Sequence, residues 1–360
     1  MNRTRTMSFA ALAVTGALAL TACGSDGGTA VTDSTSISCV SGAIKASGSS
    51  AQKNAVAEWV NTYQTACAGA TIDYQANGSG AGITDFINKQ TAFAGSDSPL
   101  KEEDKTKADA RCATGPAIDI PMVGGAIVAA YNVAGVDKLI LTPDLIAGIF
   151  SNEITKWNDP KIAAANAGVT LPDATIAQFH RSDSSGTTDN FTKYLTATAA
   201  TAWTSGAGKE WKATGGQGAK GNDGIGAAIK ATANSIGYVE LSFALDNKLS
   251  TAWVDNGGGA IEPTSTTAAA TVASATVKGT GNDLALTIDY TTKTGYPIVL
   301  VTYEITCEKG LDAGLLDLTK SFLTFTSSDA GQSKLTEFGY VPITGDLLTK
   351  VRAAVSSLSA

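Results

Sequence analysis

Short apolar and β-branched runs alternate with amphipathic segments through the first third of the chain. Residues 43–46 and 71–75 have the composition of strands, whereas residues 51–65 and 83–90 carry apolar side chains at helical spacing. Residues 93–100 add another short apolar run that is stopped by a turn. A strand followed by a helix, repeated in this way, predicts an α/β fold.

The pattern continues in a long, mostly apolar and β-leaning run, residues 118–133, which is broken by Gly124 and Gly125. We expect this run to carry the chain from one domain into another. A helix opened by Thr-Pro is expected over residues 142–150, and a strand over residues 174–179. Further expected strands are 236–239 and 296–305, and further expected helices are 188–195, 225–232 after a turn at 221–224, 310–324, 330–338 and 342–357.

The length of the chain indicates two domains. About 320 residues follow position 36, which is more than one compact core usually accommodates. Residues 264–280 are rich in Thr and Ala, and they are predicted to form an exposed excursion of the second domain.

Two loops rich in glycine and serine follow the first two expected strands. They are residues 47–50 (SGSS) and 77–82 (NGSGAG), and each leads into an expected helix. Each loop therefore lies at the carboxyl end of a strand, which is the edge where open α/β sheets bind ligands. The next strand ends near Asp97, which adds a carboxylate to the same edge.

The segment 181–187 (RSDSSGT) combines a guanidinium, several hydroxyls and a glycine directly before an expected helix. A helix N-terminus offers unpaired N–H donors and a partial positive charge, and an arginine fork matches phosphate or carboxylate. The segment therefore predicts an oxyanion site. An ordinary Ser/Asp helix cap beside a surface arginine is the alternative.

The first residues have the pattern of a lipoprotein signal peptide. Arg3 and Arg5 precede a short apolar core, and residues 20–23 (LTAC) resemble the lipobox of bacterial lipoproteins. We expect cleavage of residues 1–22 and acylation of Cys23, including palmitate, followed by a flexible tether over residues 23–36. A plain secretory signal is the alternative.

The charge of the chain argues against nucleic acid as a partner. Loss of residues 1–22 removes two arginines and no acidic residue, so the formal net charge changes from −7 to −9. An acidic surface does not steer anions from a distance, and an anion site must therefore rely on local dipoles.

Four cysteines remain after Cys23, an even number that favours two disulfides in an exported chain. Cys39 precedes the first expected strand and Cys67 ends the helix that returns antiparallel to it. We therefore expect Cys39–Cys67, which leaves Cys112–Cys307. The cysteines show no CxxC spacing or histidine partner that would indicate a metal, and no cofactor is expected.

Six motifs in a fixed order resemble a known family. They are residues 47–50, 77–82, 94–100 (AGSDSPL), 153–160 (EITKWNDP), 181–187, and 220–225 (KGNDGI) with 236–240 (IGYVE). In this order the motifs resemble PstS, the phosphate-binding proteins of bacterial high-affinity phosphate ABC transporters. The resemblance covers residues 43–355, nearly the whole mature chain.

This resemblance implies two α/β lobes of the type II periplasmic-binding-protein kind, joined by a hinge, with phosphate in the cleft between them. The first lobe would comprise residues 37–118 and 293–360, and the second lobe residues 119–292. The resemblance also implies a monomer that captures phosphate outside the cytoplasm and delivers it to the membrane permease. The lipid anchor at Cys23 would hold it to the cell membrane.

The same resemblance assigns the site. The implied phosphate-binding residues are Ser50, Ala51 through its backbone N–H, Asp97, Arg181, Ser185, Gly186 and Thr187. Family members often have an aromatic residue where this chain has Ala51. In the second loop, Gly80 stands where relatives place a serine, so either Ser79 substitutes for that serine or one hydroxyl bond is lost.

Asp97 is expected to select the ligand. Phosphate keeps at least one proton at neutral pH and can donate it to Asp97, whereas sulfate would meet the carboxylate as an unpaired charge. Asp183 is expected to pair with Arg181 and hold its guanidinium in place. His180, the only histidine, is expected to be structural.

Two other functions remain open. Ser50 or Ser185 could be the nucleophile of a phosphatase, although no His or Lys base is near either serine in sequence and no two-metal ligand set is visible. A binding protein for sulfate, tungstate or phosphonate is the second alternative. The carboxylate of Asp97 distinguishes it, because a site for a fully deprotonated anion should lack this group.

Overall fold

The computed structural model describes residues 37–360. The expected signal peptide (1–22), the lipidation site Cys23 and the tether (23–36) lie outside these residues. Within residues 37–360, no helix has both the length and the apolar character that a membrane crossing requires.

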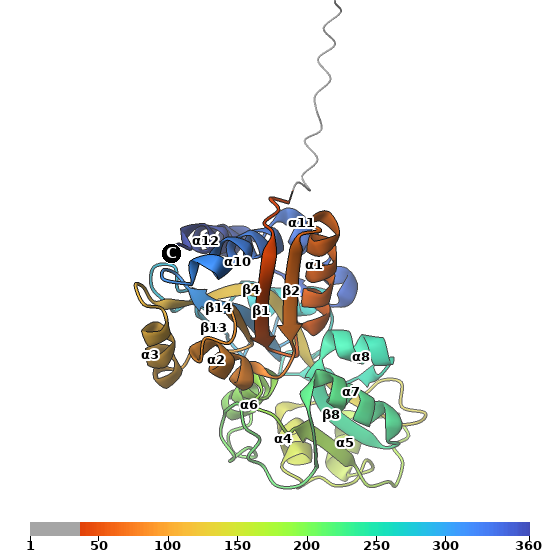
Figure 1. The fold of residues 1–360 in the computed structure, drawn as a ribbon. Coiled ribbons are helices and arrows are strands. Elements are labelled where there is room, and N and C mark those ends of the chain that lie inside the picture. Colours follow the sequence, from red (N-terminus) through yellow and green to blue (C-terminus); the bar gives the residue numbers. More distant parts are fainter. Residues whose placement is uncertain (1–36) are drawn as a thin grey trace, which may run out of the picture. The chain divides into compact units, whose positions relative to one another are not determined.

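One ten-stranded sheet runs through residues 37–360, with the order β2-β1-β3-β14-β4-β8-β6-β7, while β15 and β9 pair with β4 (Figure 1). Its strands are β1 (Gly42–Gly48), β2 (Ala70–Gln75), β3 (Phe93–Ser96), β4 (Ala117–Asn132), β6 (Ala177–Arg181), β7 (Gln217–Ala219), β8 (Ser235–Glu240), β9 (Ser250–Thr251), β14 (Val299–Cys307) and β15 (Val341–Pro342). Two small sheets contain β5 (Ile140–Leu141), β10 (Trp253–Asp255) and β11 (Ala260–Ile261), and β12 (Thr276–Val277) with β13 (Leu286–Thr287).

Helices cover the two halves of the large sheet separately. The helices are α1 (Lys53–Ala66), α2 (Ser79–Ile87), α3 (Glu102–Arg111), α4 (Pro143–Phe150), α5 (Pro160–Ala165), α6 (Gly186–Thr198), α7 (Gly221–Ala231), α8 (Leu241–Asn247), α9 (Ser265–Ala273), α10 (Ala313–Thr326), α11 (Asp329–Ser333) and α12 (Gly345–Ser357), with a 3₁₀ turn η1 (Leu335–Phe338). Figure 1 shows α1, α2, α3 and α10 to α12 around β1 and β2, and α4 to α8 around β8. We call these groups the first and second lobes.

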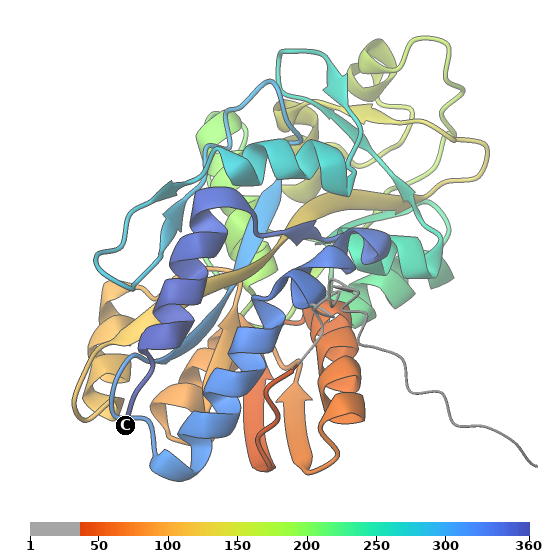
Figure 2. The same ribbon diagram turned by 90° about the horizontal axis from the view of Figure 1, so that it is seen from above.

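The long strand β4 connects the two lobes. Its residues 117–126 pair with β14 in the first lobe, and its residues 127–132 pair with β8 in the second. Figure 2 shows β4 crossing the molecule as one continuous strand. Gly124 and Gly125, which interrupt the apolar run in the sequence, do not interrupt the strand. These glycines instead make room for neighbours, since a Cβ at Gly125 would lie 3.0 Å from the Glu240 carboxylate.

Parallel pairing brings the predicted loops to one edge. In the first lobe β1 pairs in parallel with β2 and β3, and in the second lobe β6 pairs in parallel with β7 and β8. The loops after β1, β2 and β3 consequently share an edge, as the strand–helix pattern predicted. The edge faces the loop that follows β6, and this places the two sets of candidate residues opposite each other.

Two helix starts were predicted several residues too late. Helix α2 begins at Ser79 rather than 83, because its small residues let it press against β1: a Cβ on Gly82 would lie 2.4 Å from the Gly48 Cα. Helix α7 begins at Gly221, where a turn was expected, and the Asp183 carboxylate accepts its N–H at 3.0 Å.

Other predicted elements also differ from the structure. Strand β6 begins three residues later than the expected 174–179, because its pairing with β8 starts at Ala177. The helix expected over 330–338 is divided into α11 and η1. The prediction of 264–280 as an exposed excursion is wrong for its first part, since α9 packs against β4, β14 and β15 and buries Ala268 and Val272.

Both disulfides have the predicted partners. Cys39 is bonded to Cys67, and Cys112 is bonded to Cys307. The second bond joins the end of α3 to the end of β14, so it ties together two parts of the first lobe that are 195 residues apart.

Candidate anion-binding site

Asp97 stands directly after β3 with its carboxylate buried between the lobes. The Asp97 Oδ1 atom accepts hydrogen bonds from the hydroxyls of Ser49 and Thr302, the latter at 2.9 Å. Its Oδ2 atom accepts one from Thr187 of the second lobe at 3.3 Å. Burial raises the pKa of Asp97, and the hydrogen bonds from Ser49 and Thr302 and the charge of Arg181 oppose that rise.

Arg181 ends β6 and is only 1% exposed. Its Nε and Nη2 atoms donate to the two carboxylate oxygens of Asp183 at 2.7 and 2.5 Å, and its Nη1 atom donates to Thr187 at 3.3 Å. A guanidinium has five N–H groups, so two remain without an acceptor among residues 37–360. The fork is thereby fixed in direction and still has donors for a ligand.

Asp183 has the supporting position that the sequence predicted. Burial alone would raise its pKa, but the hydrogen bonds and charge of Arg181 outweigh burial, and the pKa lies below its ordinary value. Its Oδ1 atom also accepts the Gly221 N–H. Asp183 therefore orients the guanidinium and the start of α7 together.

The N-terminus of α6 faces Asp97. The Ser185 hydroxyl caps the helix by accepting the Thr188 N–H at 3.2 Å, and the Gly186 N–H donates to the Ser79 hydroxyl at 3.1 Å. The helix has 13 residues, and its dipole therefore favours negative charge at this end. The segment 181–187 thus serves both as a helix cap and as a group of converging donors.

The structure brings Ser79, and not Gly80, to the other site residues. The Ser79 hydroxyl accepts the backbone N–H groups of Asp97 and Gly186 at 3.2 and 3.1 Å. Gly80 instead lies where the lobes touch, since its N–H donates to the Ser184 carbonyl at 3.0 Å.

Ser50 and Ala51 complete the first-lobe side of the site. The Ser50 hydroxyl accepts two hydrogen bonds from Asn222, from its backbone N–H at 3.1 Å and its side-chain amide at 3.0 Å. The hydroxyl proton of Ser50 is therefore directed elsewhere and can serve a ligand. The Ala51 N–H donates to the Ser49 hydroxyl at 3.0 Å.

Three residues of this site were not assigned from the sequence: Ser49, Asn222 and Thr302. Ser49 and Asn222 lie inside motifs that were noted, but nothing local distinguished them from their neighbours. The signal for Thr302 is the alternation of Thr302, Glu304 and Thr306 in a strand whose nine residues are all buried. Polar groups on a buried face require partners.

His180 packs against Trp211 and contacts the backbone of Arg181. Its ring stacks on Trp211 with centroids 4.9 Å apart, and its Nδ1 atom is 3.0 Å from the Arg181 carbonyl oxygen. Within residues 37–360, no group of His, Cys, Asp and Glu is arranged to hold a metal ion.

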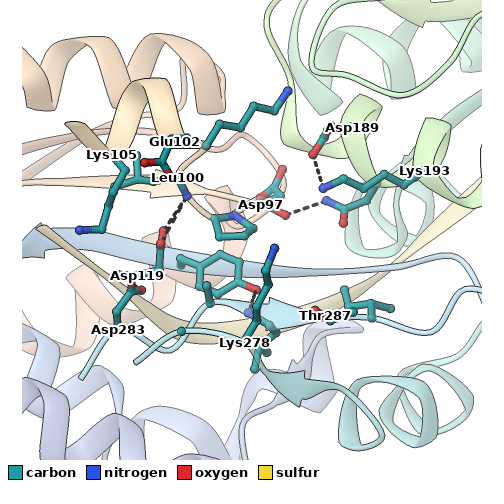
Figure 3. Close-up of a pocket in the computed structure, with 18 of the residues that line it drawn as sticks. Asp97, Leu100, Glu102, Lys105, Asp119, Asp189, Lys193, Lys278, Asp283 and Thr287 are labelled. Carbon is teal, nitrogen blue, oxygen red and sulfur yellow. Dashed lines mark hydrogen bonds and ion pairs between the residues drawn. The ribbon is translucent and has the colours of Figure 1, made fainter. Parts of the chain in front are cut away.

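A cavity of about 710 Å³ reaches Asp97 from the side of α3 (Figure 3). Asp119 lies in its lining, and burial raises the pKa of this carboxyl well above its ordinary value. The other charged residues of the lining include Lys101, Lys105, Asp189, Lys193, Lys278 and Asp283. Asp97 thus belongs both to the candidate anion-binding site and to the lining of this cavity.

Glu304 is a second buried carboxyl near Asp97. Burial raises its pKa to about 8, and the charge of Asp97 adds to the rise while Gln52 opposes it. The Glu304 Oε2 atom and the Gln52 Oε1 atom have no hydrogen-bond partner within the described chain. Gln52 Oε1 is an acceptor without a donor, and a proton on the Glu304 carboxyl would provide one. The protonated, neutral form of Glu304 therefore suits this position.

This raised pKa predicts that the protein loses stability as the pH rises from about 4.5 to 8. Between about 4.5 and 8 the folded protein keeps a proton on Glu304 that the unfolded chain releases, so the free energy of unfolding falls across this window. Glu304→Gln removes this loss, on the order of 2 to 4 kcal/mol between pH 5 and pH 9. Urea unfolding at both pH values measures the difference, and exposed Glu337→Gln is the control. An equal loss in parent and Glu304→Gln would contradict the assignment.

The fold and site define a two-lobed binding protein with a buried polar site between its lobes. A family model described as a PBP superfamily domain matches residues 33–330. Among solved structures, a high-affinity periplasmic phosphate-binding protein with bound phosphate has a TM-score of 0.70 at 22% identity, covering 87% of this chain and 93% of that one. A phosphate-binding protein from Stenotrophomonas maltophilia has a TM-score of 0.66 at 19% identity, covering 87% and 94%. These likenesses show the fold.

Curated relatives identify the family. Phosphate-binding protein PstS 3 of Mycobacterium tuberculosis is 44% identical over 357 residues, which covers 96% of each chain. Phosphate-binding protein PstS of Xylella fastidiosa is 34% identical over 304 residues, covering 83% of this chain and 80% of the relative. The chain belongs to the PstS family, and the resemblance found in the sequence motifs is confirmed.

Proposed function

We propose that the protein binds inorganic phosphate between its two lobes and delivers it, as a substrate-binding protein, to the permease of a phosphate ABC transporter. The observation that carries this proposal is the buried carboxylate of Asp97 beside the buried guanidinium of Arg181. The names of the relatives agree with it.

The presence of both charges restricts the ligand to an anion that carries a proton. Arg181, the N-terminus of α6 and several hydroxyls favour an anion, while Asp97 favours a ligand that can donate a proton. Phosphate meets both conditions at neutral pH. Sulfate meets only the first, and a buried charged acceptor without a donor costs more than about 1 to 3 kcal/mol.

In this proposal the direct donors are the side chains of Ser50, Arg181 and Ser185 and the backbone N–H group of Thr187. Phosphate also receives hydrogen bonds from the side chains of Ser79 and Thr187 and the backbone N–H groups of Ala51 and Gly186, which exchange their contacts within the site for the ligand. Ser79 supplies the second-loop hydroxyl, and Gly80 contributes by letting the lobes approach. The lobe boundaries at 118/119 and 292/293 belong to the same proposal.

We also propose that the protein performs no covalent chemistry. The Ser50 hydroxyl contacts Asn222, and the Ser185 hydroxyl caps α6. Within the described part of the chain, neither hydroxyl has a hydrogen bond to a His or Lys that could act as a general base. These contacts favour binding over hydrolysis.

The location proposed is outside the cytoplasm, where a monomer is held to the membrane by lipid on Cys23. Two disulfides support an oxidising compartment. Mass spectrometry of the N-terminal peptide tests the anchor, since acylation adds a defined mass to Cys23.

Calorimetric titration of the purified, ligand-stripped protein tests the function. At neutral pH we expect tight one-to-one binding of phosphate and no heat with sulfate. Absence of phosphate binding, or sulfate binding of equal strength, would refute the proposal. Turnover of a phosphate monoester that is abolished by Ser185→Ala would favour a phosphatase instead.

Asp97→Asn is expected to weaken the exclusion of sulfate more than it weakens phosphate affinity. An amide can both donate and accept, so it replaces a repulsive charge with a group that tolerates either anion. Titration of the variant with both anions measures the two changes. Sulfate rejection as complete as in the parent would contradict the role of Asp97.

A further inference from the structure

The two oxygens of the Asp97 carboxylate accept different hydrogen bonds, Oδ1 from the first lobe and Oδ2 in part from the second lobe. Oδ1 accepts from Ser49 and Thr302, which belong to the first lobe, as Asp97 does. Oδ2 faces the second lobe and receives only longer bonds, from Thr187 at 3.3 Å and from Ser79 at 3.5 Å. The carboxylate therefore has one firmly held oxygen and one that is turned toward the cleft.

The position of Thr302 follows from the sheet register. Strands β3 and β14 are antiparallel, with Ser96 opposite Tyr303 and Gly95 opposite Glu304. Continuing this register by one pair places Thr302 opposite Asp97. Side chains of directly opposed residues lie on the same face of a sheet. The Thr302 hydroxyl and the Asp97 carboxylate are therefore in contact, although they are 205 residues apart in the sequence.

A bulge in the neighbouring strand lies at this point. The pairing of β14 with β4 shifts between Thr302 and Tyr303, opposite Val123 and Pro121. Pro121 has no N–H for the ladder, and prolines inside sheets are tolerated at bulges. The carbonyl of the extra residue, Met122, accepts the Gln332 amide at 3.0 Å. The irregularity is thus confined to β4, and β14 keeps its alternation.

The hydroxyls of Ser49 and Thr302 are both placed to donate to Oδ1. The Ser49 hydroxyl already accepts the Ala51 N–H, so its own proton is directed to Asp97. The Thr302 hydroxyl has Asp97 as its only partner among residues 37–360, and Thr302 is fully buried. Donated hydrogen bonds favour the ionised form of a carboxylate and therefore oppose the effect of burial.

We propose that Thr302 is a specificity-determining positioning residue, which keeps Asp97 ionised and holds Oδ1 so that Oδ2 accepts the proton of a protonated oxyanion. Through Asp97 it contributes to the exclusion of fully deprotonated oxyanions such as sulfate. This inference rests on the proposed function and assigns a further residue to its selectivity.

Loss of the Thr302 hydroxyl changes the acid–base behaviour of the site. With one donated bond fewer, Asp97 takes up a proton at higher pH, and a protonated Asp97 can donate to sulfate. The other charged or titratable groups that face Asp97 are Arg181 from β6, Glu240 from the end of β8, Glu304 from β14 and Tyr74 from β2. All of them are retained when only Thr302 is changed.

The chain offers a matched control in Thr306. It lies on the same strand and the same face, is equally buried, and donates to the Ala92 carbonyl at 3.1 Å instead of to Asp97. Thr302 and Thr306 each stand two residues from Glu304, so a disturbance of Glu304 is shared by both substitutions. Only the substitution of Thr302 removes a contact with Asp97.

The experiment compares Thr302→Val, Thr302→Ser and Thr306→Val with the parent protein by calorimetric titration of phosphate and sulfate between pH 5 and pH 9. For Thr302→Val we expect phosphate affinity to fall about 10-fold at pH 7.5, as for one hydrogen bond to a charged group. We also expect sulfate binding to appear at a higher pH than in the parent. Thr302→Ser and Thr306→Val should retain the parent profile.

The proposal is overturned if Thr302→Val and Thr306→Val behave alike, or if Thr302→Val leaves the sulfate profile of the parent unchanged. Absence of phosphate binding in the parent itself would instead refute the proposed function. If Thr302→Val does not fold, Thr302→Ala and Thr306→Ala provide the same comparison.

Discussion

Arg181→Ala is expected to weaken phosphate binding by about 2 to 5 kcal/mol, the largest effect of any single change in the site. The guanidinium is 1% exposed, and its two remaining N–H groups are the charged donors that the site offers an anion. Its removal also leaves Asp183 partly buried without its cation, so a negative charge then faces the incoming anion.

Calorimetry with phosphate measures the loss, and thermal unfolding shows whether the fold is retained. Arg352→Ala is the matched control, because its guanidinium also pairs with an aspartate at 2.5 Å but lies at the surface. We expect Arg352→Ala to bind phosphate as the parent does. A smaller loss for Arg181→Ala than for Ser50→Ala would show that Arg181 is not the principal anchor.

Gly80→Ala is expected to weaken phosphate binding by about 10- to 100-fold, although Gly80 makes no contact with the ligand in our proposal. A Cβ at this position would lie 2.1 Å from the Ser184 Oγ atom and 2.5 Å from its Cβ atom. The backbone hydrogen bond between Gly80 and Ser184 fixes this approach, so the lobes must separate or shift to admit the methyl group. Overpacking of this kind costs about 1 to 3 kcal/mol, which reduces the fraction of closed protein.

The matched control for Gly80→Ala is a glycine at which an added methyl group contacts no other atom. A Cβ on Gly314 in α10 would meet no atom within 4 Å, and Gly314→Ala is expected to leave affinity unchanged. Small-angle scattering with and without phosphate reports whether the lobes of Gly80→Ala still close. Parent-like affinity of this variant would mean that the Gly80–Ser184 contact is unnecessary for binding.

Several site residues could be predicted because their signals are local. Asp97 follows a short apolar strand and Arg181 precedes a Ser-Gly-Thr helix start, so the strand end and the helix cap indicated where both residues lie, and the family resemblance assigned their roles. Thr142, whose hydroxyl accepts the Leu145 N–H, was recognised by the same rule. The pairing of Asp183 with Arg181 could be predicted because the two residues are only two positions apart in the sequence.

Other residues were missed because their partners are distant in sequence. Asn222 contacts Ser50 from 172 residues away, and Thr302 contacts Asp97 from 205 residues away. Neither residue has an unusual local pattern. The choice between Ser79 and Gly80 also depended on which one faces Gly186, a contact made only when the two lobes meet.

The amino-acid sequence by itself determined the α/β class, the carboxyl-end loops and the charged pair Arg181–Asp183, because hydrophobic period and turn residues are properties of neighbouring positions. It also determined the family, because the order of the motifs can be read directly along the chain. The tertiary structure alone decided the starts of α2 and α7, the packing of α9, and the bonds that hold Asp97. These depend on close approach between segments far apart in the chain. Such approach is set by burial and sheet register, which no short stretch of sequence contains.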